Sequence, residues 1–352
     1  MAGPSLRLAA VIGAALPLVA FVSFDAGAES VADFYKAKGL TILVGSGAGG
    51  GYDVYARTFA RHYARHIPGT PNIVIKDMPG AGGLRVTNYI ARKAARDGSE
   101  IAATAGPMTT APLIDTGDFQ FDPRTLEWIG SLAGVQTICF TWHTSGIKTL
   151  AQAREREVVV GAAGARTASA TVPRIFNALV GTKFKIVGGY ATDELRLAVE
   201  RGETQGICGL AYSTVMASQP DWIVEKKIDI LAQFGLKKDP QMPNVPLATA
   251  FASSADAERI MELILIRQEM GRPFVAPPGI PADRLAVLRR AFDRTVTGPG
   301  YRADAKRARL PVNAMDAADM KALIAKAYDA PKDIVARTVK LLADIQSSTK
   351  HK

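Results

Sequence analysis

Gly45-Ser-Gly-Ala-Gly-Gly-Gly-Tyr-Asp53 is the first of two glycine-rich turns in the sequence, and Met78-Pro-Gly-Ala-Gly-Gly83 is the second. Each turn follows an apolar run of strand length and precedes a run with helical spacing. A strand that ends in glycines and leads into a helix leaves unpaired backbone N–H groups at the positive end of the helix dipole. Neighbouring strands would bring both turns to one crevice at the carboxyl edge of a sheet. The sequence therefore predicts a site for a small anion.

The first residues predict a secretory signal peptide. Arg7 precedes an uncharged stretch, residues 8–24, and Ala26-Gly27-Ala28 supplies the small residues that a signal peptidase recognises. An uncleaved membrane anchor is the alternative, but the stretch is shorter than the roughly 20 residues that span a bilayer. We therefore expect cleavage after Ala28, so that residues 1–28 are removed and the mature chain is exported and soluble.

The length of the chain bears on the number of domains, and its charge bears on the kind of partner. The chain has 352 residues and a formal net charge of +10, and a chain of this length predicts two domains. Its Lys and Arg residues are scattered among acidic residues, without the basic stripe typical of proteins that bind nucleic acid. We expect no nucleic-acid partner but a positively biased surface that attracts anionic solutes.

Neither the cysteines nor the histidines form a recognisable reactive motif. Cys139 and Cys208 lie in short apolar runs and are too few for a disulfide framework, so we expect buried thiols rather than a bridge. His62 and His66 lack the intervening acid of a zinc hydrolase, so we expect surface histidines. No Gly-x-Ser-x-Gly nucleophile motif occurs. We expect no catalytic residue, no metal and no cofactor.

Apolar runs of strand length alternate with helical stretches along the chain, which predicts an α/β fold with mostly parallel sheets. Pro331 should divide the last helical stretch in two. The expected strands are residues 40–44, 72–76, 100–104, 137–142, 158–161, 184–187, 205–210 and 228–234. The expected helices include residues 52–67, 169–180, 194–201, 282–297 and 317–346.

The first turn formally matches the dinucleotide fingerprint through Gly45, Gly47 and Gly50. The match is weak, because no acidic residue stands clearly at the tip of the next strand and an exported chain is not supplied with nicotinamide cofactors. The turn also lacks the Gly-Lys-Ser/Thr ending of a phosphate loop. A plain structural turn needs one or two glycines rather than a repeated run, so we favour small-anion binding over either alternative.

Two further turns repeat the pattern later in the chain. Gly161-Ala-Ala-Gly-Ala-Arg-Thr-Ala168 follows a strand-like run and precedes a helical one, and Gly188-Gly-Tyr-Ala-Thr-Asp193 does the same. Arg166 either clasps a carboxylate bidentately or is a solvated loop arginine, and the sequence favours neither. These turns would serve the second domain, so that loops from both sides could hold one ligand.

Several motifs occur together in one order along the chain. Residues 44–57, the second glycine-rich turn and Ala94-Ala-Arg-Asp-Gly98 are followed by Gly161-Ala-Ala-Gly164, Met242-Pro-Asn-Val-Pro246 and Phe274-Val-Ala-Pro-Pro-Gly-Ile-Pro281. In this order and spacing the chain resembles the substrate-binding proteins of tripartite tricarboxylate transporters, over nearly all of its mature length.

The resemblance implies an α/β, two-lobed periplasmic binding protein of the type II flytrap kind, with two crossover strands. It implies a monomeric, non-enzymatic periplasmic receptor that captures a di- or tricarboxylate, an acidic amino acid or an aromatic acid in the interlobe cleft. The receptor would pass this ligand to a membrane permease of one large and one small subunit. We expect lobe 1 to comprise residues 29–130 and 235–352, and lobe 2 to comprise residues 131–234.

The resemblance also implies roles for the turns. The amides of residues 49–53 and 80–83 would hold one carboxylate, with Asp53 capping its helix, and Thr167 with residues 190–193 would meet the far end of the ligand. Ser46 replaces the family's usual aromatic residue, which moves the expected aromatic wall to Tyr52. The candidate ligand-binding residues are Ser46, Gly49, Gly50, Gly51, Tyr52, Asp53, Gly80, Ala81, Gly82, Gly83, Ala163, Arg166, Thr167, Tyr190, Thr192 and Asp193.

Two other functions stay open at this point. An exported enzyme acting on a small carboxylate could use the same crevice. A closed receptor could instead signal to a sensor kinase. Conversion of a candidate acid by the purified protein would favour the enzyme, and neighbouring genes without a permease would favour the sensor.

Overall fold

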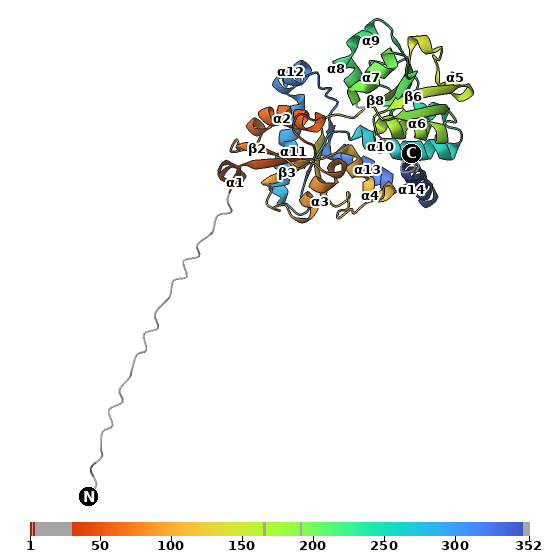
Figure 1. The fold of residues 1–352 in the computed structure, drawn as a ribbon. Coiled ribbons are helices and arrows are strands. Elements are labelled where there is room, and N and C mark those ends of the chain that lie inside the picture. The colour runs from red at the N-terminus through yellow and green to blue at the C-terminus, as the bar shows by residue number, and fades with distance from the viewer. Residues whose placement is uncertain (2, 4–29, 165–166, 191, 348–352) are drawn as a thin grey trace.

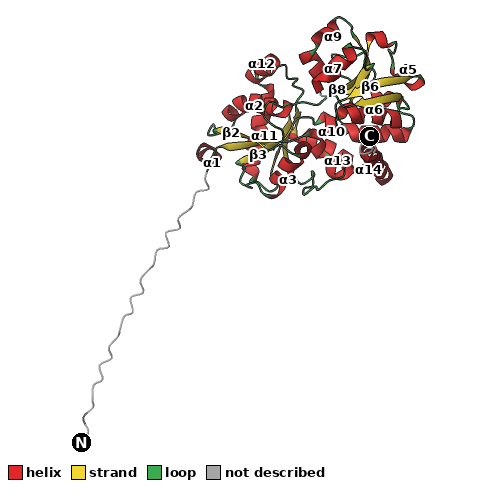
Figure 2. Cartoon of the chain, viewed as in Figure 1, coloured by secondary structure: helices red, strands yellow, loops and turns green. Residues whose placement is uncertain are grey.

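The computed structural model describes residues 1, 3, 30–164, 167–190 and 192–347. These residues form two mixed sheets, one of six strands and one of five. The expectation of mostly parallel sheets is wrong, because β5 (Thr137–Trp142), β10 (Pro273–Ala276) and β11 (Met315–Asp316) all pair antiparallel with their neighbours. Each sheet lies in its own half of the molecule between covering helices (Figure 1 and Figure 2). Apart from residues 1 and 3, the expected signal peptide lies outside the described residues.

The first sheet brings the two glycine-rich turns to one edge. Its strand order is β11-β4-β10-β3-β1-β2. β1 pairs in parallel with β2 and β3, so the three strands end at the same edge, and β10 runs antiparallel to β3 and begins there. The strands are β1 (Leu40–Val44), β2 (Ile73–Asp77), β3 (Glu100–Ala103), β4 (Glu127–Ser131), β10 (Pro273–Ala276) and β11 (Met315–Asp316).

The helices around the first sheet bury an aromatic core. Helix α2 follows the first glycine-rich turn and places Phe59 and Tyr63 at fully buried positions. The ring of Phe59 lies 4.9 Å from that of Phe274 on β10 and 5.4 Å from that of Phe292. The helical segments here are α1 (Val31–Lys38), α2 (Gly51–Tyr63), η1 (Ala64–His66), η2 (Ala81–Gly83), α3 (Leu84–Arg92), η3 (Gly106–Thr109), α4 (Ala111–Ile114), α11 (Ala282–Thr297) and α12 (Pro299–Arg307).

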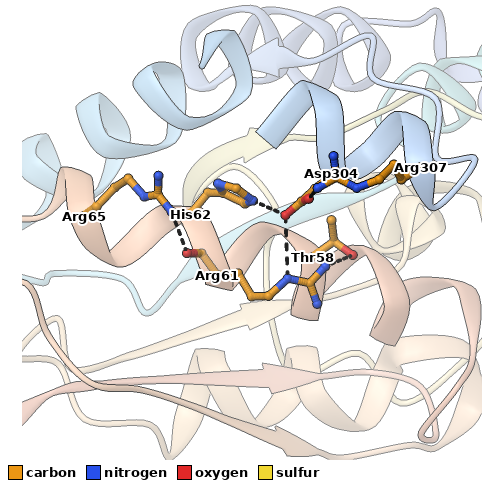
Figure 3. Close-up of polar contacts among 6 residues, drawn as sticks. All are labelled: Thr58, Arg61, His62, Arg65, Asp304 and Arg307. Carbon is orange, nitrogen blue, oxygen red and sulfur yellow. Dashed lines mark hydrogen bonds and ion pairs between the residues drawn. The ribbon is translucent and has the colours of Figure 1, made fainter. Parts of the chain in front are cut away.

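A polar cluster joins α2 to α12, as Figure 3 shows. His62 Nε2 lies 2.5 Å from Asp304 Oδ2, and Arg307 pairs with the same carboxylate. His62 is only 9% exposed, so the expectation of a surface histidine is wrong, because α12 covers this part of α2. Burial, together with the nearby guanidinium groups of Arg65 and Arg61, lowers the pKa of His62. The neutral ring can then donate Nε2–H to Asp304.

The second sheet has the strand order β7-β6-β8-β5-β9. β6 pairs in parallel with β7 and β8, whereas β5 is antiparallel to β8 and β9. The strands are β5 (Thr137–Trp142), β6 (Glu157–Ala162), β7 (Lys183–Gly188), β8 (Gly206–Ala211) and β9 (Ile228–Phe234). The helical segments are η4 (His143–Ser145), α5 (Leu150–Glu155), α6 (Ala168–Leu179), α7 (Thr192–Glu200), α8 (Tyr212–Ser218) and α9 (Pro220–Val224).

A disulfide bond joins Cys139 and Cys208, which corrects the expectation of two buried thiols. Both residues are fully buried, as expected. They face each other as paired residues on the adjacent antiparallel strands β5 and β8. The sequence separates them by 69 residues, and this strand pairing could not be read from the apolar runs alone.

Two segments connect the sheets. The first runs from β4 to β5 through residues 132–136, and the second runs from β9 through η5 (Ala248–Phe251) and α10 (Ala255–Glu269) to β10. With its amide oriented to donate, the Gln268 side chain lies 2.8 Å from Val135 O and 3.0 Å from Phe234 O. One amide at the end of α10 therefore contacts both connecting segments.

The C-terminal helices are divided as expected at Pro331. α13 (Ala317–Tyr328) ends before the proline and α14 (Lys332–Ser347) begins after it, because proline lacks the N–H that would continue the helix. α14 contacts α4 of the first half and α6 of the second. The end of the chain therefore packs against helices of both halves.

All of the expected strands are confirmed, with ends that differ by a residue at most. Three strands were not expected, namely β4, β10 and β11. β10 begins at Pro273, a residue that argues against a central strand but is tolerated at its first position. β11 spans two residues, which is too short to give a pattern.

Candidate ligand-binding site

The Asp53 side chain stabilises the first glycine-rich turn. Its carboxylate accepts the N–H of Gly49 at 2.8 Å and the Nε–H of Arg57 at 2.6 Å, and the residue is 3% exposed. The helix cap itself is Gly50, which has no side chain to cap with. The expectation that Asp53 caps its helix is thus corrected: as the third residue of α2, it reaches back to the N–H of Gly49, one residue before the cap.

The amino end of α2 offers backbone donors to the adjacent space. The Gly49 amide donates to Asp53 and the Gly50 amide donates to Gly47 O at 3.1 Å. Within the described part of the chain, the amides of Gly51, Tyr52 and Asp53 have no acceptor. Ser46 Oγ is buried nearby and also lacks a hydrogen-bond partner among the described residues. Free amides at the positive end of a 13-residue helix favour an anion.

The second turn lies directly against the first. A Cβ at Gly45 would lie 3.3 Å from Gly83 Cα and 2.9 Å from Val86 Cγ1. Gly83 has a φ of +97° and approaches the end of β3, where a Cβ would lie 3.1 Å from Ala105 N. Gly82 also has a positive φ, +63°, but faces open space. The sequence reasoning thus placed the two turns correctly beside each other.

The third and fourth turns meet at the edge of the second sheet, where Ala162 of β6 is paired with Gly188 of β7. The N–H of Ala163 donates to Ser169 Oγ at 3.1 Å, and Thr167 Oγ1 lies 2.8 Å from the same oxygen. Thr167 is the N-terminal cap residue of α6. The hydroxyl groups of this turn are therefore already engaged within it.

The remaining candidate ligand-binding residues of the second half lie in or beside the third and fourth turns. Tyr190 is partly buried and packs against the cluster that contains Leu195 and Trp222. Thr192 and Asp193 begin α7. Arg166 lies outside the described residues, so its two expected roles stay open.

Arg272 lies at the same edge of the first sheet, and the sequence reasoning missed it. Its guanidinium carbon lies 4.4 Å from the centre of the Tyr52 ring and 5.2 Å from that of Tyr55. A Cβ at Gly51 would lie 3.7 Å from Arg272 Nη2. The motif of the family resemblance began two residues later, at Phe274, and only the antiparallel pairing of β10 brings this arginine to the turn.

A cavity of about 960 Å³ lies beside the connecting segments. Its lining contains two carboxylates and five basic side chains, namely Lys237, Lys238, Arg302, Lys306 and Arg309. Its other lining residues are Gly134, Val135, Gln136, Tyr212, Ser213, Met216, Asp239, Pro240, Gln241, Gln268, Glu269, Leu310, Pro311, Val312 and Asn313. None of the candidate binding residues lines this cavity, which adds a basic surface next to the predicted site.

One of the two carboxylates in this cavity, that of Glu269, is in an unfavourable environment. Burial raises the pKa of Glu269, and the ammonium group of Lys237 only partly opposes the effect. Glu269 therefore ionises less readily than a free glutamate, in a cavity whose other charged lining residues are mostly Lys and Arg.

The described residues contain neither a side-chain cluster suited to a metal ion nor a helix suited to crossing a membrane. No group of three or more His, Cys, Asp or Glu side chains is arranged to hold a metal ion in the ranges that the structure covers. In the same ranges, no helix combines the length and apolar character needed to cross a membrane. At the first sheet edge the described residues present backbone amides, the Ser46 hydroxyl and the Arg272 guanidinium, while the carboxylates of Asp53 and Asp77 are paired with Arg57.

A family model described as the tripartite tricarboxylate transporter family receptor matches residues 56–339. The chain belongs to this family. No curated protein matches it significantly. The family assignment agrees with the resemblance drawn from the glycine-rich turns, although the matched region begins just after the first of them.

Solved structures of such receptors share the fold. A TctC solute-binding protein from Polaromonas is 20% identical, with a TM-score of 0.67 over 87% of this chain and 98% of that one. MatC from Rhodopseudomonas palustris with bound malate is 18% identical, with a TM-score of 0.58 over 86% and 98%. R. palustris Rpa4515 with adipate is 17% identical, with a TM-score of 0.58 over 88% and 97%. The expected two-lobed periplasmic binding protein fold is confirmed.

Proposed function

We propose that this receptor is exported to the periplasm, binds a small carboxylate between its lobes and delivers it to a tripartite permease of one large and one small subunit. The observation that carries the proposal is the set of free amides at the amino end of α2, beside the second glycine-rich turn. The family assignment supports it. Malate and adipate, bound in two R. palustris proteins of this fold, support a dicarboxylate. We propose a di- or tricarboxylate first, then an acidic amino acid or an aromatic acid.

We propose that the ligand is held mainly by the first lobe. One carboxylate accepts the amides of residues 51–53 and of the second turn, and the buried Ser46 hydroxyl, which lacks a partner among the described residues, donates to it or to an ordered water. The third and fourth turns, including Thr167 and residues 190–193, meet the other end of the ligand. Because Gly49 already donates to Asp53, its amide supports the turn rather than the ligand.

Closure follows from the same arrangement. We propose lobes of residues 29–130 with 235–352 and of residues 131–234, with a signal peptide removed after Ala28. The connecting segments that meet at Gln268 act as the hinge. Contacts from both lobes stabilise the closed form over the open one, and the permease recognises the closed monomer.

A thermal-shift screen of residues 29–352 tests the proposal. The panel contains citrate, succinate, malate, adipate, glutamate, aspartate, benzoate and terephthalate, with NAD as the dinucleotide comparison. A ligand that binds the native state raises the melting temperature by mass action, so millimolar acid reveals modest affinity. We expect a rise with one class of acid and none with NAD, and the acid should be recovered unchanged by NMR. Conversion of the acid would instead establish an exported enzyme.

Gly82 provides a blocking variant for this screen. A leucine at Gly82 projects into open space next to the first turn, at a cost of about 1–2 kcal/mol for its left-handed backbone. We expect Gly82→Leu to fold and to lose the ligand-induced rise. Gly146→Leu is the matched control, because Gly146 has a φ of +74° and open space but lies in the other half of the molecule. Equal ligand-induced rises in both variants would place the ligand elsewhere.

A further inference from the structure

Arg272 is placed where the proposed ligand would bind. It directly precedes β10, which runs antiparallel to β3, and the N–H of Thr104 at the end of β3 donates to Pro273 O at 3.1 Å. The residue therefore lies at the edge where β1, β2 and β3 end. Its Nη2 is 3.7 Å from the Cβ position of Gly51, the first residue of α2.

The guanidinium group is held in one orientation. Tyr52 and Tyr55 stack on it with ring centres 4.4 Å and 5.2 Å away. The Tyr55 hydroxyl donates to Pro311 O at 2.9 Å, which fixes that ring. The backbone N–H of Arg272 donates to Ser131 Oγ at 3.1 Å. Stacked arginine binds a carboxylate in a planar, bidentate manner at little further cost in side-chain entropy.

No anion of the described chain neutralises this cation. Its Nε is buried without an acceptor, and the guanidinium hydrogen bond recorded for it is from Nη1 to Gly271 O at 3.1 Å. Other part-buried arginines differ: Arg267 pairs with Asp115 and Arg289 pairs with Glu127. Burial raises the pKa of Tyr55 to about 12, so its phenol stays neutral at physiological pH. A partly buried cation without an anionic partner is less stable than a paired one, and a ligand carboxylate would supply that partner.

We propose that Arg272 is a carboxylate-binding residue of the receptor, which holds by its guanidinium the same ligand carboxylate that accepts the amides of α2. This inference rests on the proposed function and deepens it. Together, the free amides of residues 51–53 and the stacked guanidinium form a preorganised subsite for one ionised carboxylate. The two tyrosines then act as positioning residues through Arg272.

Calorimetric titration of two variants tests this assignment. The probe is whichever acid of the thermal-shift panel most raises the melting temperature of the unmodified chain. We expect Arg272→Gln to weaken binding of that acid by about 10- to 100-fold, the range for a charged hydrogen bond. Arg272→Lys keeps the charge but loses the planar pair, and its Kd should fall between those of the unmodified chain and Arg272→Gln.

Arg284→Met is the matched control. Arg284 also stacks on an aromatic ring, 3.5 Å from the centre of Phe34, and donates to Asp97 O, but it lies away from the turns. Its loss should lower the melting temperature without changing the Kd. If Arg272→Gln does not fold, the Kd of Arg272→Lys tests the assignment. A folded Arg272 variant with an unchanged Kd overturns this assignment and leaves the receptor function intact, whereas an unmodified chain that binds none of the acids overturns both.

Discussion

Gly45 is the residue at which the two glycine-rich turns meet. A Cβ there would lie 2.9 Å from Val86 Cγ1, in the buried core, and 3.3 Å from Gly83 Cα. The close approach of two backbones requires glycine at this point. Gly47, two residues later, faces open space.

We expect Gly45→Ala to lower the free energy of unfolding by about 1–3 kcal/mol through overpacking. Gly47→Ala should change it by less than about 0.5 kcal/mol, because nothing surrounds that position. Urea unfolding of both variants measures the difference. Equal stabilities would show that the turns are not in contact.

Glu269 makes stability depend on pH. Burial raises its pKa above the ordinary value of 4.5, and Lys237 only partly opposes this. The folded chain therefore binds this proton more tightly than the unfolded chain. The stability that the folded chain gains by binding this proton is present below pH 4.5 and is lost as pH rises through the pKa of Glu269 in the folded chain.

We accordingly expect Glu269→Gln to be more stable than the unmodified chain at pH 7, with the difference shrinking toward pH 4. Urea unfolding at both pH values measures it. Glu262→Gln, at an exposed position of the same helix, is the control and should change little. A Glu269→Gln variant that is less stable at pH 7 would show that the Lys237 pair outweighs burial.

At the scale of elements, the β5–β8 strand pair carries the disulfide. The bond closes a loop across 69 residues of sequence. Such a crosslink restricts the unfolded chain and typically stabilises the folded one by about 2–5 kcal/mol. It therefore adds to the stability of the second sheet, on whose strands β5 and β8 both cysteines lie.

Replacing both cysteines in a Cys139→Ala, Cys208→Ala variant should lower the free energy of unfolding by about 2–5 kcal/mol. Reductant should destabilise the unmodified chain and leave this variant unaffected, which separates the bond from the packing of its side chains. Thiol titration provides the direct check. Two reactive thiols in the unfolded, unreduced chain would contradict the pairing.

The sequence predicted the elements with clear apolar patterns, and it missed those whose pattern is weak. Parallel strands such as β1 and β6 are continuous apolar runs and were found. β10 begins with a proline, and its place between β3 and β4 depends on a pairing distant in sequence. Arg272 was missed for the same reason, since only the pairing of β10 brings this residue next to the first turn.

At the scale of the whole molecule, the two sheets, the connecting segments and the basic cavity suit capture of an anion. The net charge of +10 attracts anionic solutes from a distance, and Lys237, Lys238 and Arg309 line the cavity beside the connecting segments. The spacing of the glycines predicted the pairs of adjacent turns, because a glycine-rich turn directly follows its strand in the sequence. The cavity could not be predicted, because α12 and the loop after β9 meet only in the folded chain.

Calorimetric titration of malate and adipate into residues 29–352 tests the central claim most directly. The account predicts saturable binding of at least one of these acids, or of another acid from the thermal-shift panel, at one molecule per chain with the acid unchanged. A chain that binds none of these carboxylates at millimolar concentration, while remaining folded with its disulfide intact, would contradict it.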